Sequence, residues 1–153
     1  MTPDLLDLPL FWHLLTRLGE ATILLPAALL ALLMLLRRSA TRPVAVSWLV
    51  LLMGSTLLTT ASKLAFMGWG LGSPAFNFTG ISGHAMFAAA IYPLLLATLA
   101  SSASPNAQRL AVALGFAVAL MIGISRVKVG AHSGTEVVAG LLLGGAVSIA
   151  VLA

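Results

Sequence analysis

Two short polar clusters lie between long apolar runs, and they hold the residues that could do chemistry. The larger cluster, Ser125–Glu136, contains an arginine, a lysine, a histidine and a carboxylate, and the smaller is Ser82-Gly83-His84. A charged side chain costs roughly 2.5–3.5 kcal/mol at the bilayer centre, so charges beside membrane spans usually serve a function. Histidines with a carboxylate can act as nucleophile and general acid or base, and a helix N-terminus with cations can hold an anion. The clusters therefore predict one phosphate site.

The composition predicts an integral membrane protein. Of the 153 residues, 60% are hydrophobic and 8% are charged, whereas soluble domains carry about 25% charged residues. The net charge of +4 comes without a basic run interleaved with aromatic residues, so nucleic acid is not an expected partner. The absence of cysteine excludes disulfides, iron–sulfur clusters and thiolate metal sites. Residues 1–153 are expected to form a single domain, and the non-basic N-terminus predicts no cleaved signal peptide.

The apolar runs predict an all-α fold, a polytopic transmembrane bundle of about five helical spans. Pro43 is suited to the first turn of the second span. Pro93 falls inside the third span, where we expect neighbouring helices to satisfy the freed backbone group. Gly140 and Gly144 form a small-xxx-small pattern that permits close helix packing. The predicted spans are residues 20–36, 44–67, 82–100, 110–124 and 133–152.

Residues 1–18 precede the first span and predict an amphipathic helix lying in the membrane interface. Apolar residues recur there at helical spacing, with His13, Thr16 and Arg17 opposite, and the run is too short and too polar to span a bilayer. Trp12 suits the level of the lipid headgroups. We expect His13 to belong to the polar face of this helix rather than to the phosphate site.

Five spans fix which charges share a membrane face. Arg37, Arg38, Arg42 and Arg109 fall on one side, which the positive-inside rule makes cytoplasmic. Lys63 and both polar clusters fall on the other side, where no topological rule favours basic residues, so binding an anion is the simplest explanation. We therefore expect a protein of a bacterial inner (cell) membrane, with its site facing the periplasm or exterior.

The helix topology predicts that the two clusters meet. The third and fourth spans form a hairpin, so the start of the third, the end of the fourth and the start of the fifth share one membrane face, and His84 can approach His132. His132 and Glu136 are at i and i+4 on one helical face. Glu136 can hold one ring nitrogen and leave the other as a nucleophile or base. Arg126 and Lys63 can neutralise a phosphate.

These motifs resemble the signatures of the type 2 phosphatidic acid phosphatase family, the lipid phosphate phosphatases. That family carries K-x6-R-P, then P-S-G-H, then S-R-x5-H-x3-D. The stretch Ser125–Glu136 keeps the spacing of the third signature, and Ser82–His84 matches the end of the second. With Lys63 as the lysine of the first signature, the resemblance runs in the family's order from Lys63 to Glu136 and lies between membrane spans.

The chain departs from those signatures at three places. Ile81 stands where the family has a proline, and Glu136 stands where it has an aspartate, which keeps the charge and adds one methylene. Gly70 and Leu71 stand where the first signature has Arg-Pro, so one phosphate-binding cation is absent from that loop. Lys128 is a possible substitute for it.

The resemblance implies a metal-independent membrane phosphatase that hydrolyses a phosphomonoester or pyrophosphate of a lipid. It implies that His132 attacks phosphorus to form a phosphohistidine, that Glu136 orients His132, and that His84 protonates the leaving group and then activates water. The implied substrates are isoprenyl pyrophosphate, phosphatidic acid, phosphatidylglycerol phosphate and lipid A, and no cofactor is implied. The residues implied to bind phosphate are Lys63, Ser82, Gly83 and Arg126, with Lys128 as a possible addition.

Several alternatives use the same residues. Arg126, Lys128 and Lys63 could be interfacial anchors whose heads reach toward water. Two histidines and a carboxylate could bind zinc, although the adjacent cations would repel a divalent ion. The chain could also be a non-hydrolytic lipid-phosphate binding or transport protein on a decayed phosphatase scaffold, or a lipid phosphotransferase. Retention of both histidines favours an enzyme, because a binder needs only the cations.

Overall fold

The structure, a computed structural model, describes residues 9–153. Within that range the chain is all-helical and has no strand beyond an isolated bridge between Ser73 and Phe78. The part of the predicted interfacial helix in residues 1–8 lies outside the described residues. The α-helices are α1 (Pro9–Arg17), α2 (Ala21–Leu36), α3 (Arg42–Trp69), α4 (Gly83–Leu99), α5 (Pro105–Lys128) and α6 (Gly134–Leu152), with 3-10 turns η2 (Ser39–Thr41) and η3 (Pro74–Phe76).

The structure has an apolar helix at each of the five predicted spans, and two of these helices are longer than predicted. α2, α4 and α6 match their predicted ranges closely, α3 is two residues longer at each end, and α5 continues at both ends through polar and charged residues. Pro43 and Pro105 lie in the first turns of α3 and α5, where a missing N–H group leaves no helical bond unmade. The predicted fourth span ends at residue 124, whereas α5 continues to Lys128, so Arg126 lies in the last turn of the helix and not beyond it.

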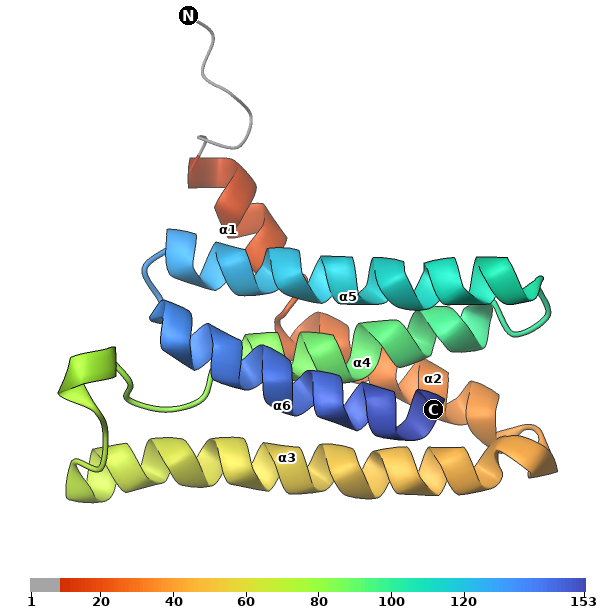
Figure 1. Cartoon of the computed structure of the whole chain (residues 1–153), viewed down its shortest axis with the longest axis horizontal. Helices are drawn as coiled ribbons and strands as arrows, with labels where there is room; N and C mark the ends of the chain where they lie inside the picture. Colours follow the sequence, from red (N-terminus) through yellow and green to blue (C-terminus); the bar gives the residue numbers. More distant parts are fainter. Residues whose placement is uncertain (1–8) are drawn as a thin grey trace, which may run out of the picture.

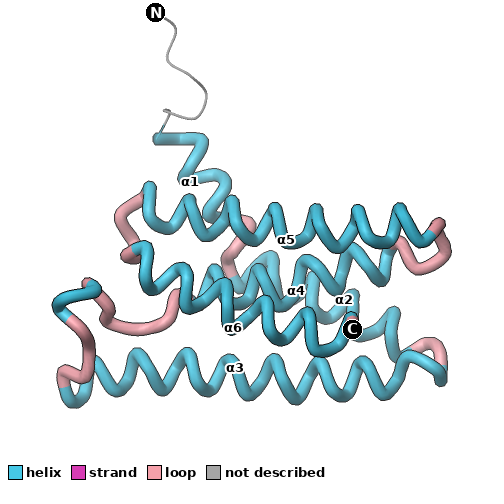
Figure 2. Tube along the Cα trace, viewed as in Figure 1, coloured by secondary structure: helices cyan, strands magenta, loops and turns pink. Residues whose placement is uncertain are grey.

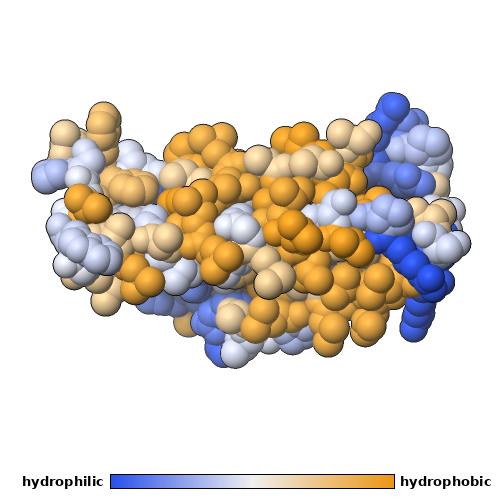
Figure 3. All heavy atoms as spheres, turned by 90° about the horizontal axis from the view of Figure 1, so that it is seen from below, coloured by the Kyte–Doolittle hydropathy of each residue, from blue (hydrophilic) through white to orange (hydrophobic). Residues whose placement is uncertain are grey.

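The outer surface is suited to a bilayer. The described chain has four apolar stretches long enough to cross a membrane, whereas α4 is apolar but shorter. A turn at residues 18–20 divides the first stretch into α1 and α2. Figure 3 shows an apolar belt on the face covered by α3, with hydrophilic surface at the ends of the molecule. The four stretches are Pro9–Leu36, Ser39–Trp69, Pro105–Lys128 and Gly134–Leu152.

Helix α4 lies at the centre of the bundle and packs against α2, α5 and α6 (Figures 1 and 2). Its sequence is apolar around the whole helix, which is typical of a helix buried on every side. The small side chains of Ala88, Ala89 and Ala90 are at most 1% exposed. α3 runs along α6 on the far side of the bundle from α5, and α1 projects from the bundle beside the carboxyl end of α5 (Figure 1).

Helix α6 crosses α4 at very short range. A Cβ atom placed on Gly140 would lie 2.5 Å from the carbonyl oxygen of Ser82 and 3.1 Å from the Cβ atom of Ala85. A Cβ atom on Gly144 would overlap the carbonyl group of Met86. These contacts confirm that the small-xxx-small pattern marks close helix packing.

Pro93 frees a backbone carbonyl in the middle of α4, and a neighbouring helix satisfies it. Proline has no N–H group to donate to the carbonyl four residues earlier, which is that of Ala89. The hydroxyl of Ser148 on α6 donates to that carbonyl at 2.7 Å, and the indole N–H of Trp48 on α3 donates to the carbonyl of Ala90 at 2.9 Å. The prediction that neighbours repair the backbone at Pro93 is confirmed.

We predict that Gly144→Ala destabilises the bundle. The added methyl group has to displace the backbone of Met86, and overpacking of this kind costs about 1–3 kcal/mol. The measurement is thermal unfolding of the purified protein in detergent. The matched control is Gly54→Ala on α3, where no atom lies within 4 Å of an added Cβ atom. Equal midpoints for the two variants would contradict the close α4–α6 crossing.

Candidate active site

The two polar clusters come together at one end of the bundle. The start of α4, the carboxyl end of α5 and the start of α6 lie at the same end in Figure 1. The backbone N–H of Ser82 donates to the carbonyl oxygen of Glu136 at 3.1 Å, which joins the two clusters directly.

His132 and Glu136 form a bonded pair at the start of α6. The Nδ1 atom of His132 lies 2.7 Å from the Oε2 atom of Glu136, and both side chains are largely buried. Ser133 caps the helix: its hydroxyl accepts from the backbone N–H of Glu136, and its own N–H donates to the Glu136 carboxylate at 3.1 Å. This capping box fixes the carboxylate beside the ring. Because the carboxylate can only accept a hydrogen bond, the proton is assigned to Nδ1 of His132, and Nε2 carries the free lone pair.

The second carboxylate oxygen of Glu136 is held by a residue that sequence reasoning missed. Both the backbone N–H and the hydroxyl of Thr79 lie 2.6 Å from Oε1 of Glu136. Thr79 lies in the loop between α3 and α4, three positions before Ser82. Its place just before the second polar cluster was the available signal. The extra methylene of glutamate lets one carboxylate reach both His132 and this loop.

His84 lies in the first turn of α4, close to the other charged groups. Arg126, His132, Glu20 and Lys63 all lie within electrostatic range of its ring. The chain between α1 and α2 packs directly on the ring, because a Cβ atom placed on Gly19 would lie 3.0 Å from the Cδ2 atom of His84. The structure therefore brings both histidines to one site.

The start of α4 offers donors for an anion, although not all those expected. The N–H of Ser82 is used in its bond to Glu136 and is therefore not free to bind an anion. The N–H groups of Gly83 and His84 have no acceptor among the described residues, as is usual in the first turn of a helix. The hydroxyl of Ser82 is fully buried and has no partner in the described chain. A phosphate oxygen would satisfy these groups.

Arg126 reaches the site from the last turn of α5, and α1 positions it. One terminal nitrogen of Arg126 donates to the hydroxyl of Thr16 at 2.8 Å, while its buried Nε atom has no described partner. Thr16 is 8% exposed. Its assignment to the polar, water-facing side of an interfacial helix is therefore wrong, because Thr16 faces the site.

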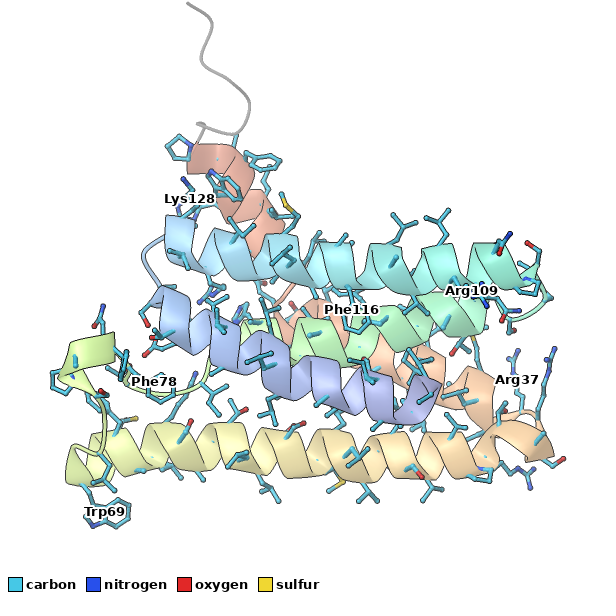
Figure 4. All side chains as sticks on the ribbon, in the orientation of Figure 1. Arg37, Trp69, Phe78, Arg109, Phe116 and Lys128 are labelled. Carbon is cyan, nitrogen blue, oxygen red and sulfur yellow. The ribbon has the colours of Figure 1, made fainter. Side chains whose placement is uncertain are left out.

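The two lysines behave differently. The backbone of Lys63, near the end of α3, lies against Gly80 in the loop that leads to α4, where a Cβ atom on Gly80 would lie 3.3 Å from the Cα atom of Lys63. Its side chain is exposed and within electrostatic reach of His84. Lys128 instead places its ammonium group 5.9 Å from the centre of the Trp12 ring on α1. Figure 4 labels Lys128 beside this helix.

Gly70 and Leu71, which stand where the family's first signature has Arg-Pro, form an exposed turn. Gly70 ends α3 in a left-handed conformation (φ 66°), and Leu71 follows it with an exposed side chain.

Glu20, which immediately precedes α2, is a neighbour of the site that the sequence did not indicate. It acts electrostatically on both His84 and Arg126. Glu20 also lies 3.9 Å from Arg17. A carboxylate close to phosphate-binding groups can hold their cations in place before an anion arrives.

A polar cavity opens beside the nucleophile candidate. It has a volume of about 360 Å³ and is lined by the loop residues Asn77 and Thr79, by the 130–133 turn and by Glu136. His132 forms part of its wall, whereas His84, Arg126 and Lys63 do not line it. Among residues 9–153, no three histidine, aspartate or glutamate side chains gather as a metal site would require.

Comparison with known proteins gives consistent matches. An uncharacterized 22.5 kDa protein in the cps region of Klebsiella pneumoniae is 42% identical over 135 residues, which cover 88% of this chain and 65% of that protein. The chain thus spans slightly less than two thirds of the length of this curated relative. The crystal structure of a transmembrane PAP2 type phosphatidylglycerolphosphate phosphatase from Bacillus subtilis matches with a TM-score of 0.72 and 26% identity, over 94% of this chain and 74% of that one.

The family model of the PAP2 superfamily matches residues 55–153. That range takes in the end of α3, the loop with Thr79, and the starts of α4 and α6 from which the site is built. The chain is an all-helical membrane protein that belongs to the PAP2 superfamily.

Proposed function

We propose that this chain is a phosphatase that removes phosphate from a phosphomonoester or pyrophosphate of a membrane lipid through a phosphohistidine. The observation that carries the proposal is the 2.7 Å bond from Nδ1 of His132 to the buried carboxylate of Glu136, which leaves Nε2 as a nucleophile. Membership of the PAP2 superfamily and similarity to a membrane phosphatidylglycerolphosphate phosphatase support it.

The first step forms a bond between Nε2 of His132 and phosphorus and breaks the bond between phosphorus and the leaving oxygen. His84 donates its proton to that oxygen, so the lipid leaves as an alcohol or, from a pyrophosphate, as a monophosphate. Glu136 stabilises the positive charge that develops on His132. The N–H groups of Gly83 and His84, the Ser82 hydroxyl and the Arg126 guanidinium hold the phosphoryl oxygens.

The second step reverses the roles. His84, now neutral, takes a proton from a water molecule whose oxygen attacks phosphorus. The bond between phosphorus and Nε2 breaks, inorganic phosphate leaves, and His132 regains its lone pair. No metal takes part in this proposal, because the cations supply the charge stabilisation. Lys63 is placed to reach the phosphate from α3, and the exposed turn at Gly70 leaves that side of the site without the family's arginine.

The charge distribution supports an orientation for the protein. Arg37, Arg38, Arg42 and Arg109 lie at the end of the bundle opposite the site, as the positive-inside rule requires of the cytoplasmic side. Figure 4 labels Arg37 and Arg109 at that end and Lys128 at the other. We propose that the site acts on lipids of the outer leaflet of a bacterial inner membrane. The substrate classes are isoprenyl pyrophosphate, phosphatidic acid, phosphatidylglycerol phosphate and lipid A.

We predict that His132→Ala abolishes phosphate release, by at least about 1,000-fold, because no other group can form the phosphoryl intermediate. The assay uses purified protein in detergent with one substrate from each of the four classes, with EDTA and no added metal. His13→Ala is the matched control, since His13 is exposed on α1. Unchanged release in His132→Ala would contradict the histidine mechanism. Loss of wild-type activity in EDTA would contradict metal independence.

The same panel separates the enzyme from its alternatives. A phosphotransferase should label His132 from a radioactive substrate without releasing phosphate until an acceptor is added. A binding protein should neither label His132 nor release phosphate from any substrate, although it binds them.

We predict that Glu136→Gln lowers kcat about 100-fold or more. The carboxylate accepts from His132, from Ser133 and twice from Thr79, so the amide NH₂ group of glutamine must face one of these donors and displace it. Glu136→Asp keeps the charge but is too short to reach Thr79 and His132 together, so its loss should be smaller. Steady-state kinetics and thermal unfolding of both variants provide the check. A glutamine variant as active as the aspartate variant would show that the charge is not required.

We predict that Thr16→Val raises KM about three- to tenfold and changes kcat less, because Arg126 loses the acceptor that positions it for phosphate. Thr16→Ser retains the hydroxyl and should behave as wild type. Kinetics over a range of substrate concentration separate the two constants. If serine and valine variants have the same KM, then α1 does not position Arg126.

A further inference from the structure

A second cavity lies at the end of the bundle opposite the candidate active site. It has a volume of about 360 Å³ and is formed where the ends of α2, α4 and α6 meet the starts of α3 and α5. Arg37 and Arg38 form one side of it. The remaining lining residues are Met34, Leu35, Thr41, Val44, Leu94, Ala97, Thr98, Ser101, Gln108 and Leu152.

Within residues 9–153, four arginine side chains and no aspartate or glutamate side chain lie at this end of the bundle. The chain has four carboxylate side chains, of which Glu20 and Glu136 lie at the active-site end. The other two, Asp4 and Asp7, fall outside the described residues. Arg42 and Arg109 add to the positive charge without lining the cavity. Figure 3 shows strongly hydrophilic surface gathered at this end of the molecule.

The two arginines supply charged hydrogen-bond donors. In the described chain no side chain or backbone group accepts from the guanidinium of Arg37 or Arg38. Two hydroxyls in the wall are already committed, because Thr41 donates to the carbonyl of Leu35 and Thr98 donates to that of Leu94 at 2.7 Å, whereas the hydroxyl of Ser101 has no acceptor among the described residues. The Gln108 amide nitrogen donates to the backbone of the 101–103 turn. A ligand that enters here therefore meets guanidinium groups, which prefer a phosphate or carboxylate.

The rest of the cavity wall is apolar. Leu35, Val44, Leu94 and Leu152 also line it, and they belong to the hydrophobic core of the bundle or pack against it. Free phosphate would contact only the arginines and would gain nothing from this apolar part. A phospholipid presents a headgroup phosphate directly above its acyl chains, so it matches both parts. Basic pockets between transmembrane helices are known to favour anionic lipid headgroups.

We propose that this cavity binds the headgroup phosphate of an anionic phospholipid, as a lipid site separate from the catalytic one. The positive-inside rule explains arginines at this end but does not require a cavity among five helices. A lipid bound here contacts the ends of those five helices at once. It therefore stabilises the folded bundle by mass action, in proportion to its concentration.

The experiment measures thermal unfolding of the full chain in detergent with added phosphatidylglycerol, which is an anionic phosphodiester. Phosphatidylcholine with the same acyl chains and inorganic phosphate are the comparison ligands. We expect phosphatidylglycerol to raise the melting temperature more than either comparison ligand. In the double variant Arg37→Gln with Arg38→Gln, its apparent affinity should fall about tenfold or more, because two charged donors are lost.

Two further variants make the test specific. Arg42→Gln with Arg109→Gln removes the same charge from the same end outside the cavity and should keep the affinity. Ala97→Phe fills the cavity without changing any charge and should weaken binding. Equal losses in the two double variants would show only surface attraction and overturn the proposal. An equal shift with inorganic phosphate would also overturn it, since the site would then bind simple anions. Phosphate release by each variant reports that it is folded.

Discussion

A buried carboxylate next to a hydrocarbon phase is tolerated only when each of its oxygens has hydrogen-bond donors, and the site depends on this constraint at Glu136. One carboxylate oxygen accepts two hydrogen bonds from Thr79, and the other accepts from His132 and Ser133. The backbone carbonyl of Glu136 accepts from the N–H of Ser82. These donors come from the α3–α4 loop, the start of α6 and the start of α4. The hydrogen bonds to this one residue therefore join three segments of the chain. Two of these segments carry the candidate catalytic histidines.

Much of the fold could be predicted because a bilayer demands long apolar runs, and the positions of α2, α4 and α6 follow from them. The ends of α5 could not, because Arg109 and Arg126 look like residues just outside a span although the helix includes both of them. Long basic side chains reach toward water while their backbone stays helical, so charge marks the depth of a residue and not the helix terminus. The pairing of His132 with Glu136 was foreseeable, since helical periodicity alone sets it.

The residues that sequence reasoning missed make contacts between distant segments. Thr16 meets Arg126 across 110 positions, and Thr79 meets Glu136 across 57. Neither threonine belongs to a repeated sequence pattern. The sequence of an amphipathic helix does not tell whether its threonine side chain faces water or bonds to a buried partner. Only the packing of α1 beside the end of α5 decides the question for Thr16. Glu20 is similar, because its relation to His84 depends on the turn between α1 and α2.

The glycine contact between α6 and α4 has a consequence for how this chain can vary. Gly140 lies one helical turn beyond Glu136 and touches the carbonyl group that immediately precedes α4, so the crossing sets the axial register of the two helices that carry the histidines. The connection between α4 and α5 lies at the other end of the bundle, at residues 100–104. Residues can therefore be inserted or deleted in that distant loop without altering the spacing of the histidines.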